Sequence, residues 1–385
     1  MNGSTPFKID CIVGARPNFV KIAPIMRALS SRAGLVPRLI HTGQHYDFVM
    51  NAVFFDELRI PAPDINLEVG SGTNTEQTAR VMLALEPVFL AQRPDLLMVV
   101  GDVNSTIAAT LVASKMLIPV AHVEAGLRSF DRAMPEEVNR LVTDRLSDLL
   151  FTTERVALDN LTHENVAPER ITFVGNVMID TLFACLERAV DPGQTFAEIG
   201  ASEAFQSAAR EKGFAFVTLH RPSNVDDPVK LAALLGALAT ISRRLPIVFP
   251  IHPRTRGMIA NAGLEPLLAE PGIATAPPLS YLRAIGLMRA ARLVVTDSGG
   301  VQEETTALGV PCLTARENTE RPITIDQGTN TLIGVDPARL IAAVDDVLTT
   351  GGKKGRAPDL WDGRAAERIA DATLAFLQRG REAIA

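Results

Sequence analysis

Two carboxylates that each follow a short apolar run are the first candidates for catalysis in this sequence. Asp102 comes after the run 96–100 and Glu124 after the run 118–123, and the segment 107–116 between them has the composition of a helix. This order predicts a β-α-β unit with a right-handed crossover. Because the carboxyl ends of parallel strands share the sheet edge where ligands bind, both carboxylates are expected in the same crevice.

The next predicted helix adds an acidic and a basic residue. Pro135 suits the first turn of that helix, so Glu136 and Arg140 lie at i and i+4 on one face. Together with Asp102 and Glu124 they indicate proton transfer on an anionic substrate. The structural alternative is capping of strand ends combined with a surface salt bridge.

The turn Ser298-Gly299-Gly300 carries the strongest local signal for phosphate binding. It follows the apolar run 292–296 and opens a helix, so free N–H groups of the helix start would face a ligand beside the Ser298 hydroxyl. Glu304, one turn further on, could accept hydrogen bonds from ribose hydroxyls. The helix dipole alone also favours an acidic residue there.

Basic residues at the first strand-to-helix turn indicate a second place for an anion. The run 8–13 leads into a turn that contains Gly14 and Arg16, and the helix that follows carries Lys21 in its opening turns. A structural role for Arg16 fits equally well. His220 and His252 each close an apolar strand, where a histidine is more often structural than a ligand.

The composition is that of a globular enzyme. With 385 residues, of which 47% are hydrophobic and 21% charged, the chain is long enough for two domains and too apolar for disorder. The net charge of −6 gives no reason to expect nucleic acid or an anionic membrane as a partner, and no membrane segment is expected. Cys11, Cys185 and Cys312 form no metal or redox pattern, so no metal is expected and the cytoplasm is the predicted location.

Apolar runs alternate with helical segments, and a second alternating series begins after an interruption at 187–212. We interpret that interruption as a linker or domain boundary. The predicted fold class is α/β, with two doubly wound Rossmann-like lobes that face each other across a cleft. The predicted domains are an N-terminal lobe with the catalytic carboxylates at 1–186, a C-terminal lobe at 187–363, and a last helix at 364–385 that crosses back to the first lobe.

Nine ordered segments carry a resemblance to one enzyme family. They are GARPNFVKIAPI, TGQHYDFVM, GDVNST, HVEAGLRS, MPEEVNR, GNVMID, TLHRPSNVD, TDSGGVQEE and NTERP. From near residue 8 to near residue 335 the chain resembles the non-hydrolysing UDP-N-acetylglucosamine 2-epimerases. The resemblance implies the two-lobed glycosyltransferase B-type fold, binding of UDP in the C-terminal lobe, and interconversion of UDP-GlcNAc and UDP-ManNAc without an external cofactor.

The resemblance also assigns roles to single residues. It implies catalytic roles for Asp102, Glu124, Glu136, Arg140 and His220, and substrate binding by Arg16, Lys21, Ser298, Gly299, Gly300, Glu304 and Arg321. Gln44, Arg221 and His252 match a second UDP-GlcNAc site of bacterial family members. The implied partners are a UDP-sugar and UDP, and the implied assembly is a homodimer.

Three other functions stay open at this point. An epimerase of a modified UDP-HexNAc, such as a UDP-2,3-diacetamido sugar or its uronic acid, would keep every motif. A glycosyltransferase of the same fold would share the phosphate turn but would need an acceptor. A regulator that binds nucleotide sugars without turnover would not need the carboxylates. The sequence also leaves open which carboxylate serves which face of the sugar C2.

Overall fold

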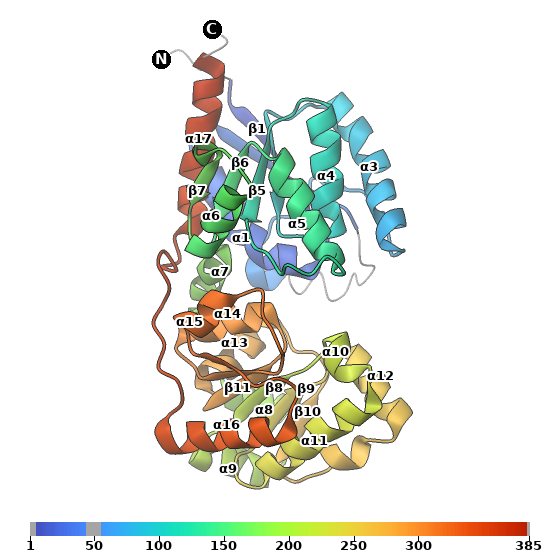
Figure 1. Cartoon of the computed structure of the whole chain (residues 1–385), viewed down its shortest axis with the longest axis vertical. Helices are drawn as coiled ribbons and strands as arrows, with labels where there is room; N and C mark the ends of the chain where they lie inside the picture. Colours follow the sequence, from blue (N-terminus) through green and yellow to red (C-terminus); the bar gives the residue numbers. More distant parts are fainter. Residues whose placement is uncertain (1–4, 44–54, 383–385) are drawn as a thin grey trace. The chain divides into compact units, whose positions relative to one another are not determined.

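The computed structural model describes residues 5–43 and 55–382, with the exception of the Arg16 side chain. The chain divides into two units, one formed by Met1–Ala184 with Asp359–Ala385 and the other by Cys185–Pro358. Each unit contains one sheet whose paired strands are all parallel, with helices in the connections (Figure 1). The predicted α/β class with two doubly wound sheets is therefore confirmed.

The first unit has a seven-stranded sheet in the order β3-β2-β1-β4-β5-β6-β7. Its strands are β1 (Phe7–Val13), β2 (Leu35–His41), β3 (Ile65–Asn66), β4 (Leu96–Val100), β5 (Val120–Ala125), β6 (Leu149–Thr152) and β7 (Ile171–Phe173). Its helices are α1 (Arg16–Ser31), α3 (Asn74–Ala91), α4 (Asn104–Lys115), α5 (Pro135–Leu146), α6 (Arg155–His163), α7 (Val177–Cys185) and α17 (Ala365–Glu382). The strand order reverses between β1 and β4, which makes their carboxyl ends the place where this fold binds ligands.

The core of the first unit explains why its central strands are continuous apolar runs. Every residue of β4 is buried, as expected of a parallel strand that is covered on both faces. Val81, Leu85 and Phe89 follow one face of α3 at helical spacing and pack with Leu97 and Val99 of β4. The strand that carries Asp102 at its end is thus fixed by the core.

The last helix, α17, belongs to the first unit although it follows the second unit in the chain (Figure 1). The N–H groups of Ala365 and Ala366 at its start donate to the Asp180 carboxylate at 3.2 and 2.8 Å. Further along, Asp371 accepts from Arg32, which directly follows α1, at 2.6 Å. The predicted return of the last helix to the first lobe is therefore confirmed.

The second unit has a six-stranded sheet in the order β10-β9-β8-β11-β12-β13, which reverses between β8 and β11. Its strands are β8 (Ala215–Thr218), β9 (Ile247–Pro250), β10 (Ile273–Ala276), β11 (Leu293–Thr296), β12 (Cys312–Thr314) and β13 (Asn330–Leu332). Its helices are α8 (Pro192–Glu198), α9 (Glu203–Lys212), α10 (Pro222–Val225), α11 (Pro228–Ser242), α12 (Pro253–Ala262), α13 (Tyr281–Ala290), α14 (Gly299–Leu308), α15 (Pro322–Asp326) and α16 (Pro337–Thr350).

Of the two interpretations of 187–212, the linker is wrong, because most of the segment forms α8 and α9 of the second unit. The division between the two units falls just before the segment, after Ala184. Asp191 caps α8 by accepting from the N–H of Gly193, and Ser202 caps α9 by accepting from the N–H of Phe205. Phe196 and Phe205 are buried and stack edge to face with ring centroids 5.5 Å apart. In the described ranges, no helix is long and apolar enough to cross a membrane.

Candidate active site

Asp102 directly follows β4, at the reversal of strand order in the first sheet. Gly101 before it has a φ of 67°, which glycine adopts without strain, and donates its N–H to the carbonyl of Val123 at 3.0 Å. The Asp102 carboxylate accepts from Arg140 Nη2 at 2.6 Å, and its backbone carbonyl accepts from Asn139 Nδ2 at 2.8 Å. With 22% of the side chain exposed, the carboxylate is fixed and still accessible to a ligand.

Glu124 lies within a strand, whereas the sequence predicts that the strand ends before it. The register between β5 and β6 shifts between Val123 and Ala125, so Glu124 is the extra residue of a β-bulge. Its φ is 73°, a conformation that costs a residue other than glycine about 1–3 kcal/mol and persists only where neighbours hold it. The Glu124 carboxylate is buried and forms an ion pair with Lys21 of α1.

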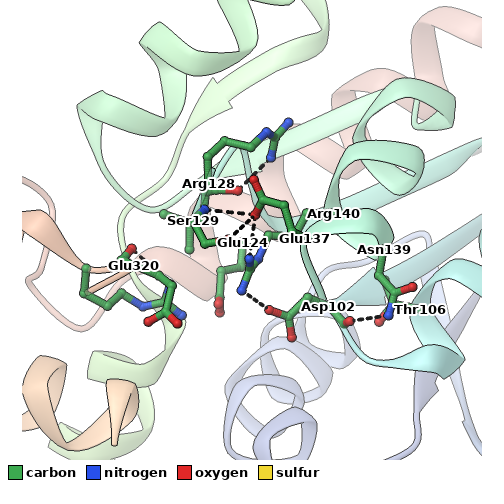
Figure 2. Close-up of polar contacts among 12 residues, drawn as sticks. Asp102, Thr106, Glu124, Arg128, Ser129, Glu137, Asn139, Arg140 and Glu320 are labelled. Carbon is green, nitrogen blue, oxygen red and sulfur yellow. Dashed lines mark hydrogen bonds and ion pairs between the residues drawn. The ribbon is translucent and has the colours of Figure 1, made fainter. Parts of the chain in front are cut away.

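Arg140 is held between two carboxylates, Asp102 and Glu137 (Figure 2). Its Nη1 donates to Glu137 Oε2 at 2.8 Å, whereas Glu136 is exposed. The acid of α5 that binds this arginine is thus Glu137, the neighbour of the predicted Glu136. The i, i+3 spacing of Glu137 and Arg140 is the sequence signal that could have found the pair.

Glu137 also joins helix α5 to the loop before it. Its carboxylate accepts from the N–H and hydroxyl of Ser129 at 2.9 and 3.0 Å and from the N–H of Phe130 at 3.1 Å. Burial alone would raise the pKa of Glu137, but these hydrogen bonds and that of Arg140 hold it below its ordinary value. Glu137 therefore stays ionised and keeps Arg140 in place for Asp102.

Asn18 organises the first strand-to-helix turn, and sequence reasoning missed it. Its Oδ1 accepts from the N–H groups of Gly14 and Ala15 at 3.2 and 3.1 Å, and its Nδ2 donates to the carbonyl of Val100 at 2.8 Å. The side chain thus ties the end of β1 to the end of β4. Asn18 thus binds the backbone N–H groups of Gly14 and Ala15 at this predicted anion site, and the Arg16 side chain lies outside the described part of the chain.

In the second unit, His220 and Asp297 follow the neighbouring strands β8 and β11. The buried Asp297 carboxylate accepts from His220 Nδ1 and from the backbone N–H of His220 and of Arg221, at 3.0, 3.0 and 2.9 Å. Asn224 Nδ2 donates to it at 3.0 Å. Burial raises the pKa of Asp297, but His220 and these N–H donors bring it below its ordinary value.

Asp297 therefore fixes the orientation of His220. Because Nδ1 donates to the carboxylate, Nε2 is the ring nitrogen that remains for a ligand. The His220 side chain is 38% exposed, which gives a ligand access to it. Sequence reasoning missed this role of Asp297, although its place directly before the glycine turn is a signal for it.

The predicted phosphate turn opens helix α14. Ser298, Gly299 and Gly300 are partly exposed, and a Cβ atom on Gly299 would meet nothing within 4 Å. The first N–H groups of a helix have no partner inside it, and the helix N-terminus favours an anion. The turn thus has the open space and the donors that a phosphate needs.

Two further predicted binding residues of this unit have acidic or phenolic partners. Glu304 is buried and accepts from the Tyr281 hydroxyl at 2.7 Å, and Arg321 Nε lies 2.7 Å from Glu303 Oε1. Burial and the charge of Glu304 raise the pKa of Tyr281 well above its ordinary value, so the hydroxyl stays a donor. Tyr281 was not among the residues predicted from the sequence.

The residues predicted for a second nucleotide-sugar site are described only in part. Gln44 lies outside the described residues. The ring of His252 is 5.6 Å from that of His220 between centroids, and Arg221 lies 3.5 Å from Glu320. Burial would raise the pKa of Glu320, but the neighbouring Arg316 and Arg221 lower it to about 2. Over residues 5–43 and 55–382, no three acidic, histidine or cysteine side chains are grouped as a metal site requires.

Comparison with known proteins connects this arrangement to one family. The family model described as UDP-N-acetylglucosamine 2-epimerase matches residues 27–374. The UDP-N-acetylglucosamine 2-epimerase of Methanocaldococcus jannaschii is 40% identical over 365 residues, which cover 94% of this chain and 97% of that protein. The UDP-2,3-diacetamido-2,3-dideoxy-D-glucuronate 2-epimerase of Pseudomonas aeruginosa is 40% identical over 374 residues, which cover 94% and 98%.

A solved structure agrees with the sequence comparisons. The crystal structure of Methanocaldococcus jannaschii UDP-GlcNAc 2-epimerase in complex with UDP-GlcNAc and UDP matches with a TM-score of 0.82 and 39% identity. The match covers 96% of this chain and 99% of that one. Family model, relatives and structure all extend over both units. The chain therefore belongs to the UDP-N-acetylglucosamine 2-epimerase family of isomerases.

Proposed function

We propose that this chain interconverts UDP-GlcNAc and UDP-ManNAc by eliminating UDP and adding it back. The C2 hydrogen of a sugar is scarcely acidic, so a base alone does not remove it. Stretching of the C1–O bond to UDP gives C1 oxocarbenium character, which acidifies C2. The reaction thus needs a carboxylate near C2 and cations or N–H donors that hold the departing diphosphate.

The proposed reaction consists of two balanced halves. In the first, the C1–O bond breaks with its electron pair on the β-phosphate oxygen, and a carboxylate takes the C2 proton, which leaves the double bond of 2-acetamidoglucal. In the second, that oxygen bonds C1 again and C2 receives a proton on its opposite face. No net oxidation or reduction occurs, so no external cofactor is expected.

The observation that carries the proposal is the set of carboxylates in the first unit. Asp102 follows β4, and Glu124 lies at the bulge of the neighbouring strand β5. Each has a cationic partner, and the exposed Glu136 lies at the start of α5. These three are the proposed proton-transfer groups. His220, Arg321 and the turn Ser298–Gly300 of the second unit, with Arg16 of the first, are proposed to hold UDP while it is detached.

One alternative substrate has a specific observation in its favour. The Pseudomonas aeruginosa relative, named for a UDP-2,3-diacetamido-2,3-dideoxy-D-glucuronate, is as similar to this chain as the Methanocaldococcus jannaschii UDP-N-acetylglucosamine enzyme. Epimerisation of a modified UDP-HexNAc at C2 is therefore the second candidate function. It uses the same carboxylates and differs only in the groups at C3 and C6.

We further propose that the enzyme acts as a homodimer in the cytoplasm. The fully buried thiols Cys11 and Cys312 suit a reducing compartment. The homodimer rests on the family to which the chain belongs. Gln44, Arg221 and His252 stay the predicted residues of a second UDP-GlcNAc site.

The proposal is tested by incubating the purified protein with each candidate UDP-HexNAc alone and following the sugar by NMR. We expect a C2 epimer from UDP-GlcNAc, formed without any acceptor. An epimer formed only from the diacetamido uronate would favour the second candidate. If the protein binds UDP but forms no epimer from any of these substrates, the result would favour a protein that binds nucleotide sugars without turnover.

A further inference from the structure

His122 is a fully buried histidine that bonds to two of the elements carrying the proposed catalytic acids. It lies in β5, two residues before Glu124. Its Nε2 is 2.9 Å from the carbonyl oxygen of Gly101, the residue before Asp102, and its Nδ1 is 2.6 Å from Asp144 Oδ1. One side chain thus links the turn of Asp102 to helix α5.

Asp144 completes this link on the other side of Glu124. Its carboxylate is fully buried and accepts from the N–H of Gly126, two residues after Glu124, at 3.0 Å. Arg128 Nη1 lies 2.8 Å from Asp144 Oδ2, and Arg128 Nη2 lies 2.7 Å from Glu164. Burial would raise the pKa of Asp144, but His122 and Arg128 keep it below its ordinary value.

The contacts surround the bulge that displays Glu124. A left-handed conformation of a glutamate persists only where the surrounding structure holds it. The residue two positions before Glu124 and the residue two positions after it are both bound to the same buried carboxylate. That carboxylate comes from α5, the helix that also carries Glu136 and Arg140.

We propose that His122 and Asp144 are positioning residues that set the distance and orientation between Asp102 and Glu124. The inference rests on the proposed epimerisation, in which two acids serve opposite faces of one carbon. Neither residue touches the sugar in this account. They hold the end of β4, the bulge of β5 and helix α5 together, so that a proton leaves and returns at fixed geometry. A misplacement of about 1 Å is enough to lower a rate about 10²-fold.

The test compares His122→Gln and Asp144→Asn with the control Asp10→Asn in the full-length protein. Asp10 is an equally buried acid of the same unit, which binds Arg38 at 2.8 and 2.6 Å within β1 and β2. We expect both test variants to lose about 10²-fold in kcat with unchanged KM and unchanged affinity for UDP. The control should keep the wild-type kcat.

Two further measurements separate positioning from general loss of stability. Misplaced acids return the proton late, so the test variants should release more 2-acetamidoglucal for each epimer formed. Hydrogen exchange at Gly101 and Gly126 should become faster in the test variants and stay unchanged in the control. The glutamine of His122→Gln keeps an amide donor for the carbonyl of Gly101. If Asp144→Asn does not fold, the test therefore rests on His122→Gln.

The inference is overturned if kcat stays at the wild-type value, if it falls equally in the control, or if the loss is confined to KM. A wild-type protein that epimerises no UDP-HexNAc refutes the proposed function instead. In that case the hydrogen-exchange comparison still reports whether His122 and Asp144 hold the two strand ends together.

Discussion

At the scale of single residues, the three proposed proton-transfer acids lie in three different environments. Asp102 is partly exposed beside Arg140, Glu124 is buried beside Lys21, and Glu136 is exposed at the start of α5. The exposed carboxylate is open to water, whereas the buried one is shielded from water and paired with a cation. The difference in environment suits a pathway in which one acid removes a proton and another delivers one.

Replacing Asp102, Glu124 or Glu136 by its amide should lower kcat by about 10²-fold or more, because each amide loses the ability to transfer a proton. The folded structure should persist, as judged by circular dichroism, and Asp10→Asn serves as a buried control away from the site. Near wild-type turnover in all three amides would contradict the assignment.

Glu136 and Glu137 are adjacent in sequence and should respond differently to the same substitution. Glu136→Gln should lower turnover without changing the free energy of unfolding, since the side chain is exposed. Glu137→Gln should destabilise the protein by about 2 kcal/mol, because it weakens hydrogen bonds to Arg140, Ser129 and Phe130. Urea unfolding of both variants measures this, and equal losses of stability would show that the two roles are assigned wrongly.

At the scale of the elements, the sequence predicted best what depends on local pattern. The fully buried strands β4 and β6 begin and end where their apolar runs do, and Pro135 starts α5 as expected. The edge strands β3, β10 and β13 were missed because each has only two to four residues and is not fully buried. Helices α8 and α9 were missed because Pro192, Gly193 and Gly200 break up the apolar periodicity of 187–212.

The parts of the site that the sequence did not predict depend on tertiary register. The bulge at Glu124 exists only through the pairing of β5 with β6, and the partner of Arg140 depends on which face α5 buries. Asn18, His122 and Asp144 act through bonds to distant backbone or side-chain groups. Such bonds leave no spacing signal in a single sequence.

The docking of α17 should make stability depend on pH through Asp180. Burial raises the pKa of Asp180 to about 6 from an ordinary value of 3.8, against the opposing N–H groups of Ala365 and Ala366. An acid with a raised pKa in the folded state contributes stability below its unfolded pKa, and this contribution is lost as pH rises through the folded pKa. The free energy of unfolding lost in this way is about 3 kcal/mol.

The measurement is urea unfolding of the wild type and of Asp180→Asn from about pH 4 to pH 7. The stability of wild type relative to the variant should fall between about pH 4 and pH 6 and then level off. A difference that does not change with pH would show that Asp180 has an ordinary pKa in the folded protein.

At the scale of the whole molecule, the proposed acids and the proposed phosphate donors are divided between two units. Asp102 and Glu124 belong to the first unit, and His220 and the turn Ser298–Gly300 to the second. Asp102, His220 and Ser298 come after strands between which strand order reverses. A reaction that uses both groups has to retain a detached intermediate, and closure around the ligand is the usual means.

Binding of UDP should therefore make the molecule more compact. Small-angle scattering with and without saturating UDP measures the radius of gyration, which we expect to fall. An unchanged radius at saturation would contradict closure and leave the proton chemistry of the first unit untouched.

The central claim is that epimerisation proceeds by loss and return of the C2 proton. The most direct measurement is the reaction run to equilibrium in D₂O with EDTA present and no nicotinamide added. We expect deuterium at C2 of both epimers and at no other sugar carbon, with traces of free UDP and 2-acetamidoglucal. An epimer that fully retains its original C2 hydrogen, or a reaction that requires NAD, would contradict the account.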